Sequence, residues 1–124
     1  MWRPIRSGSV HCSVIDFARY AQFHLGVVGE GLLSMTSRDR LHTAPAGRDY
    51  AMGWVMIRRD WAGGTAFTHA GSNTMFYAVI WIAPERNFAA VVMCNYGGKE
   101  APSTCDRVIA YLIDKHCLPA VGDS

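Results

Sequence analysis

Apolar positions in the first part of the chain repeat with the period of a helix. Ser13 is a favourable N-cap, with Asp16 three residues on as a partial capping box, and Gly26 suits a helix end. The pattern therefore predicts a helix over 14–25. One face of this helix would carry the apolar residues Val14, Phe17, Ala18, Ala21 and Leu25.

Two further helices are predicted later in the chain. Ser34 is a second N-cap candidate before a short helix over 35–42, which would stop at Pro45. Pro102 suits the first turn of a closing helix. The apolar face of that closing helix would be formed by Val108, Ile109, Leu112 and Ile113.

Between these helices the apolar period changes to two. Alternation from Tyr50 to Ile57 predicts a strand, Arg58 to Gly64 a hairpin-like connection, and 65–69 a second strand. Residues 76–83 and 88–95 predict two more strands, joined by a tight turn that begins at Pro84. The last two strands are apolar on both faces and need a covering layer on each side.

This order of elements predicts an α+β fold. We expect an antiparallel β-sheet of about four strands with helices packed on it. The 124 residues suffice for a single domain spanning 1–124, and we find no repeat or linker that divides it.

Composition and charge narrow the possible partners. Charged residues make up 18% of the chain and the net charge is only +2. Arg58 and Arg59 are the only adjacent basic pair, so we predict no nucleic-acid partner. No apolar run approaches the roughly 20 residues of a membrane span. The segment Met1–Arg6 lacks the apolar core of a signal peptide, so the chain is either cytoplasmic or exported by a signal on sequence not included here.

The four cysteines predict buried side chains rather than a metal or disulfide framework. Cys12, Cys94, Cys105 and Cys117 form no C-x-x-C pair. Cys105 and Cys117 would lie roughly 18 Å apart along a helix, too far for a disulfide. His11-Cys12 and His116-Cys117 lack a third ligand at suitable spacing, so we predict no metal site and no cofactor.

The strongest candidate for chemistry is the stretch Thr68-His69-Ala70-Gly71-Ser72-Asn73. It lies between two strand-like runs and places a polarisable His beside small residues, where a substrate backbone can approach closely. Trp61, in the loop just before this strand, is the best candidate for an aromatic residue that faces a substrate.

Three local signatures resemble the serine β-lactamases and penicillin-binding proteins, in their class C-like esterase branch. Ser9 to Tyr20 is similar to that family's "small residue, Ser, x, x, Asp, aromatic, Ala, Arg" helix start. Tyr50-Ala51-Met52-Gly53-Trp54 resembles its Tyr-x-x-Gly-Trp strand. His69-Ala70-Gly71 resembles the third catalytic box, Lys-Thr-Gly in many members and His-x-Gly in the esterases.

The resemblance implies a role for each residue of the third box. His69 would help to polarise the site or would bind the polar end of the acyl substrate. Gly71 would allow close approach of the substrate, and Ser72 would offer a backbone N–H to the oxyanion. Ala70 lacks the hydroxyl that binds a substrate carboxylate, which favours uncharged acyl esters over β-lactams. Asn73 would belong to the same substrate-binding stretch.

The family's other two boxes are missing. No Ser is followed three residues later by Lys, and no Tyr-x-Asn or Ser-x-Asn is found. The resemblance thus implies the C-terminal part of a hydrolase that is often periplasmic or secreted, acts on small acyl esters or amides, and is inactive in this part alone. A non-catalytic interaction module, and half of a split enzyme completed by an N-terminal partner chain, are the alternatives. An uncovered apolar face and sheet edge would favour self-association.

Overall fold

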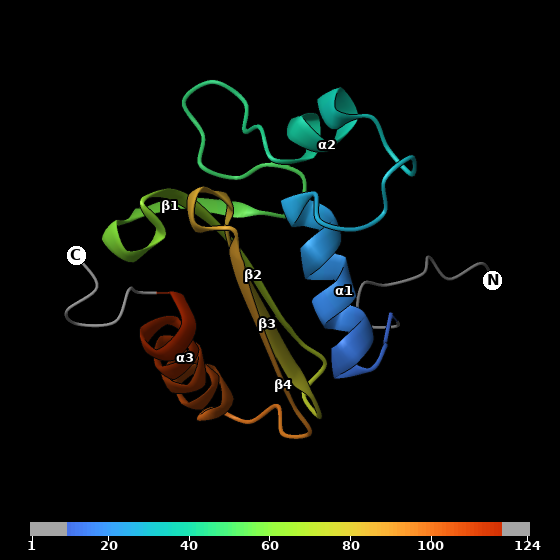
Figure 1. The fold of residues 1–124 in the computed structure, drawn as a ribbon. Helices are drawn as coiled ribbons and strands as arrows, with labels where there is room; N and C mark the ends of the chain where they lie inside the picture. Colours follow the sequence, from blue (N-terminus) through green and yellow to red (C-terminus); the bar gives the residue numbers. More distant parts are fainter. Residues whose placement is uncertain (1–9, 118–124) are drawn as a thin grey trace.

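The structure, a computed structural model, describes residues 10–117 and confirms the α+β prediction (Figure 1). The helices are α1 (Val14–Leu25), α2 (Met35–Leu41) and α3 (Ala101–Leu112), the last continued by a π-helical turn, Ile113–Cys117. The strands are β1 (Val55–Arg59), β2 (Gly64–Ser72), β3 (Tyr77–Ala83) and β4 (Phe88–Cys94). Short 3₁₀ turns, Asp60–Ala62 and Pro84–Arg86, join β1 to β2 and β3 to β4.

The four strands form an antiparallel meander in the order β1-β2-β3-β4. β2 pairs with β3 from Phe67 opposite Ile82 to Ser72 opposite Tyr77. β1 is shorter, and its pairing with β2 stops at Val55 opposite Thr68. Within the described residues, the second half of β2 therefore has a strand on its β3 side only.

The limits of α1 follow from its caps, as predicted. The Ser13 side chain accepts a hydrogen bond from the Asp16 backbone N–H at 3.1 Å. Gly26 ends the helix in the left-handed region, at φ 81°, and its N–H bonds back to the last turn. Both ends of α1 are thus satisfied by residues next to it in sequence.

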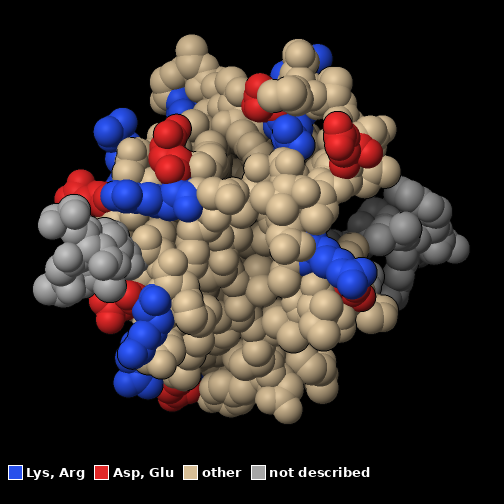
Figure 2. Space-filling view, viewed as in Figure 1, with Lys and Arg blue, Asp and Glu red and all other residues tan. Residues whose placement is uncertain are grey.

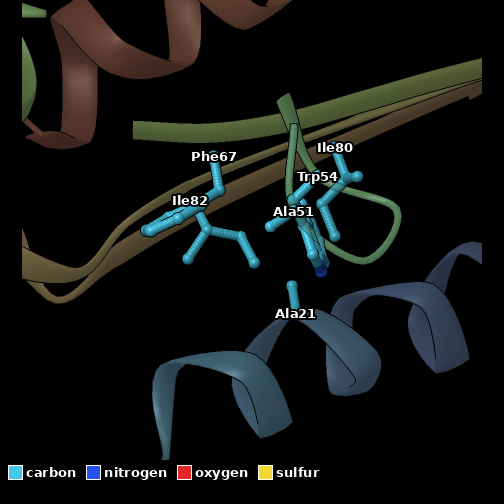
Figure 3. Packing of buried hydrophobic residues seen from close by; sticks show 6 residues of the cluster. All are labelled: Ala21, Ala51, Trp54, Phe67, Ile80 and Ile82. Atoms are coloured by element: carbon cyan, nitrogen blue, oxygen red, sulfur yellow. The ribbon is translucent and has the colours of Figure 1, made fainter. Parts of the chain in front are cut away.

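Helices cover both faces of the sheet, as the apolar strands β3 and β4 require (Figure 1). On one face, Ala21 of α1 points at the cluster of buried residues drawn in Figure 3: Ala51, Trp54, Phe67, Ile80 and Ile82. On the other face, α3 packs Cys105, Ile109 and Ile113 against Val79 and Ala90 of the strands. The two clusters lie on alternate residues of β3, the arrangement of a strand buried on both sides.

The predicted first strand was wrong over its first half. Gly53 has a left-handed backbone conformation, with φ 84°, and this conformation is incompatible with an extended strand. A tight turn forms instead, in which the Ala51 N–H donates to the carbonyl of Trp54 at 2.8 Å. This turn buries Ala51 and Trp54 and leaves Met52 exposed, and β1 begins only at Val55.

Other boundaries and faces also differ from prediction. Arg58 and Arg59 belong to β1 rather than to the connection, and β2 continues past His69 to Ser72. Val14, in the first turn of α1, and Val108 of α3 are exposed, although the sequence pattern placed both on buried faces. Ser9, the first residue of the helix-start signature, lies outside the described residues.

Charges are dispersed over the visible surface. On the face drawn in Figure 2, Lys and Arg stand apart from one another with Asp and Glu among them, and a broad central area is uncharged. No continuous basic stripe forms on that face. None of the helices in the described part of the chain is long and apolar enough to cross a bilayer.

Candidate functional site

An open cavity of about 1000 Å³ lies at the end of the sheet where β2 turns into β3. The first half of α1, the end of β2, the start of β3 and the end of β4 all contribute to its lining. One part of the wall is aromatic, formed by Phe17, Tyr20, Trp54 and Phe76. The size and the mixture of apolar wall and few polar groups are typical of small-molecule sites.

The alternation of β2 places His69 and Gly71 on one face of the sheet. They lie opposite Ile80 and Ala78 of β3, and all four line the cavity. His69 is exposed, and a Cβ built on Gly71 would meet nothing within 4 Å. The cavity thus has a His and an open backbone position side by side on one strand.

Ser72 and Asn73 line the cavity from the turn between β2 and β3, and both shape that turn. The Ser72 hydroxyl accepts from the Thr74 backbone N–H at 3.1 Å. The Asn73 side-chain oxygen accepts from the N–H groups of Met75 and Phe76, at 3.1 and 2.8 Å. Asn73 therefore has its amide NH₂ left to offer a ligand, and Thr74 takes the left-handed conformation that closes the turn.

The cavity lacks an activated serine within the described residues. The hydroxyl of Ser72 has the Thr74 N–H as its partner and no hydrogen bond to a base. Nucleophilic catalysis by a hydroxyl needs a base within hydrogen-bond reach. Ser72 therefore acts here as a turn residue, and its candidate role is confined to its backbone.

Two of the predicted site residues lie elsewhere. Ala70 sits opposite Val79, whose side chain packs toward α3, so the methyl group of Ala70 is on the face of the sheet away from the cavity. Trp61 is half-buried in the cluster beneath α3, with its ring centroid 5.9 Å from that of Trp81 and 6.4 Å from that of Phe88. The structure brings His69, Gly71, Ser72 and Asn73 together, without the side chains of Ala70 and Trp61.

Tyr20 and Trp54 provide the aromatic surface that Trp61 was expected to provide. Their rings are stacked, with centroids 6.4 Å apart and planes 14° from parallel. Partial burial raises the pKa of Tyr20, which keeps its hydroxyl protonated as a donor. The sequence could have predicted this position of Tyr20. Tyr20 follows Phe17 by three residues, so the two side chains share the side of α1 next to the cavity.

A pair of histidines behind Trp54 was not anticipated from the sequence. His24 Nδ1 and His42 Nε2 are 2.8 Å apart, and both rings pack edge-on against Trp54. Burial, then the neighbouring His42, lowers the pKa of His24 to about 4. Burial also lowers the pKa of His42. Both rings are thus neutral at pH 7 and share one proton between the facing nitrogens.

The described residues hold no group of three His, Cys, Asp or Glu side chains that would bind a metal ion. The polar residues of the cavity lining are instead two histidines, two asparagines, three hydroxyl-bearing residues and two cysteines: His11, His69, Asn73, Asn95, Tyr20, Ser72, Tyr77, Cys12 and Cys94. Such a lining can orient and polarise an uncharged carbonyl compound against the aromatic wall.

Comparisons with protein-family models, with curated proteins and with solved structures found no match to this chain.

Proposed function

We propose that this chain forms the C-terminal part of a β-lactamase-like serine hydrolase that cleaves uncharged acyl esters or amides. The observation that carries the proposal is that His69 and Gly71 of the His-x-Gly sequence line one cavity with an aromatic wall. In that family the third box lines the catalytic cleft from a strand. The Ser-x-x-Lys nucleophile and the second box would come from an N-terminal portion or a partner chain.

The free side of β2 supports this division of the site. Past Thr68 no described strand pairs with β2 on the β1 side, so alternate backbone groups of His69–Ser72 face outward. The carbonyl of a bound acyl substrate can lie against such an edge. The proposed N-terminal portion can place its serine on the same side. Gly71 leaves space for that approach.

Complementation of the isolated chain tests the proposal. The chain is mixed with a separately expressed N-terminal portion that carries Ser-x-x-Lys, and hydrolysis of p-nitrophenyl esters is followed. We expect no turnover from either part alone and turnover from the mixture. In the mixture, His69→Ala should lower kcat/KM by about 100-fold.

Gly71→Ala gives a sharper reading of the same site. Because the added Cβ meets no atom within 4 Å, the isolated chain should keep its thermal stability. It should nevertheless lose activity in the mixture, since the methyl group narrows the approach to the strand. His116→Ala, on the exposed π-helical turn, is the control and should leave activity unchanged. Equal activity of Gly71→Ala and the native chain would contradict the proposed approach of substrate to β2.

A non-catalytic interaction module is the second candidate. The observation in its favour is the unactivated Ser72 in a cavity whose lining includes two exposed apolar side chains, Phe76 and Met93. Absence of turnover under every pairing, with tight binding of the N-terminal portion retained, would select the module over the hydrolase.

A further inference from the structure

Two of the four cysteines meet between the end of β4 and the middle of α3. The Sγ atoms of Cys94 and Cys105 are 3.7 Å apart, with the Cys105 thiol directed at Cys94. The prediction of buried cysteines was wrong for Cys12, which is exposed just before α1. Cys117 directs its thiol at the carbonyl of Trp61. All four are free thiols, and Cys94 and Cys105 are in position to react with each other.

The two thiols differ in access. Cys105 is only 2% exposed, packed among Val79, Ala90 and Ile109. Burial, reinforced by the hydrogen bond to Cys94, raises the pKa of Cys105 to about 11 and keeps it a thiol at neutral pH. Cys94 is half-buried at the end of β4, with its side chain on the α3 face of the sheet. A small oxidant therefore reaches Cys94 first.

We propose that Cys94 and Cys105 are a reversible redox pair that closes to an intramolecular disulfide when a peroxide reaches Cys94. The Cys94 sulfur attacks the peroxide O–O bond and becomes a sulfenic acid, and one oxygen leaves as water. The Cys105 sulfur then attacks the sulfenic sulfur and forms the S–S bond; its thiol proton passes to the departing hydroxyl, which leaves as a second water. Two thiols are oxidised and one peroxide is reduced.

The geometry requires only a local movement. A disulfide bond is about 2.05 Å long, so the sulfurs must approach by roughly 1.7 Å. Cys94 is the last residue of β4 and is followed by the connection that contains Gly97 and Gly98, so the strand end can adjust. The two cysteines are only 11 positions apart, and the bond would close a short loop.

The loop that this bond closes touches the candidate site. A Cβ built on Gly97 would lie 2.5 Å from the carbonyl carbon of Thr74, so Gly97 rests directly on the turn between β2 and β3. That turn carries Asn73 at the cavity wall. Oxidation would therefore join α3 to the loop beneath the turn, whether or not the cavity is part of a hydrolase.

Peptide mapping after peroxide treatment tests the pair. The full chain is exposed to hydrogen peroxide, alkylated without reduction and digested with trypsin. Cleavage at Lys99 separates the two cysteines, so the disulfide appears as peptide 87–99 joined to peptide 100–107. We expect this pair, the loss of two of the four titratable thiols, and recovery of both after dithiothreitol.

Variants distinguish this disulfide from other products. Cys12→Ser and Cys117→Ser should each still lose two thiols, whereas Cys94→Ser should not form the linked peptides. Cys105→Ser places a hydroxyl in the core and could prevent folding. In that case, peptide mapping of the native chain and of Cys94→Ser is sufficient to test the proposal. The proposal is overturned if Cys94 is recovered only as a sulfinic acid, or if it is linked to Cys12 or Cys117.

Discussion

His24 and His42 form a titratable contact directly behind Trp54 of the cavity wall. The 2.8 Å separation of the facing nitrogens is satisfied only while one of them lacks a proton. Arg38 opposes protonation of both rings, and Asp39 favours it at His42. The pair thus joins α1 to the end of α2 as a neutral hydrogen bond.

Acid should weaken the hydrogen bond between His24 and His42 and so lower the free energy of unfolding. The unfolded His takes up a proton near pH 6.5, whereas the pKa of His24 in the folded chain is about 4. Between these values the unfolded state binds more protons, so stability falls as the pH falls, by on the order of 2 kcal/mol. Urea unfolding from pH 7 to pH 4.5 measures this loss.

His24→Gln provides the test of cause. Gln keeps a polar partner for His42 and does not titrate, so the stability of this variant should depend less on pH between 6.5 and 4.5. His116→Gln, at an exposed position, is the matched control and should retain the native pH dependence. If both variants retain it, the histidine pair is not its source.

At the scale of elements, the two N-capped helices differ in what their caps support. Ser13 caps α1, which buries Ala21 and His24. Ser34 caps α2 in the same way, accepting from the Ser37 N–H at 3.0 Å, but α2 buries no residue. A cap contributes more to global stability when the helix that it caps packs against the core.

Ser13→Ala should therefore lower the free energy of unfolding by about 1 kcal/mol. Ser34→Ala should cost clearly less, because α2 can fray without opening the core. Denaturant titration followed by tryptophan fluorescence measures both. An equal cost for the two variants would mean that α2 is as integral to the core as α1.

Element types were predictable from the sequence, and their exceptions have physical causes. The caps and apolar periods of 14–25 and 88–94 are local signals, and the structure follows them. The turn at Gly53 depends on a left-handed backbone that apolar alternation cannot reveal. In the site, His69 and Gly71 follow from strand alternation, whereas the place of Trp61 depends on packing against α3, which no local signal encodes.

At the scale of the whole molecule, an unpaired strand edge adjoins exposed apolar side chains. β2 has no described partner beyond Thr68 on its β1 side. Phe76, in the turn that follows, is 53% exposed, and Met75 beside it is 67% exposed. Strand edges of this kind pair readily with another chain, and apolar patches strengthen the contact.

We expect the isolated chain to self-associate through this end of the sheet. Size-exclusion chromatography with light scattering should show a mass above that of the 13.7 kDa monomer, increasing with concentration. Phe76→Asp should shift the population toward monomer. Tyr111→Asp, on the exposed side of α3, should not. A native chain that stays monomeric at every concentration would rule out the association.

The packing of α1 against β4 has a consequence for how the chain folds. β1 to β4 pair only with their neighbours in sequence, so the meander can assemble from short hairpins as it is made. α1 precedes all four strands in sequence, yet the strand that it contacts most extensively is β4, the last of the four. The docking of α1 is therefore complete only after β4 has been made, and until then part of the apolar face of the hairpins is open to water and to other nascent chains.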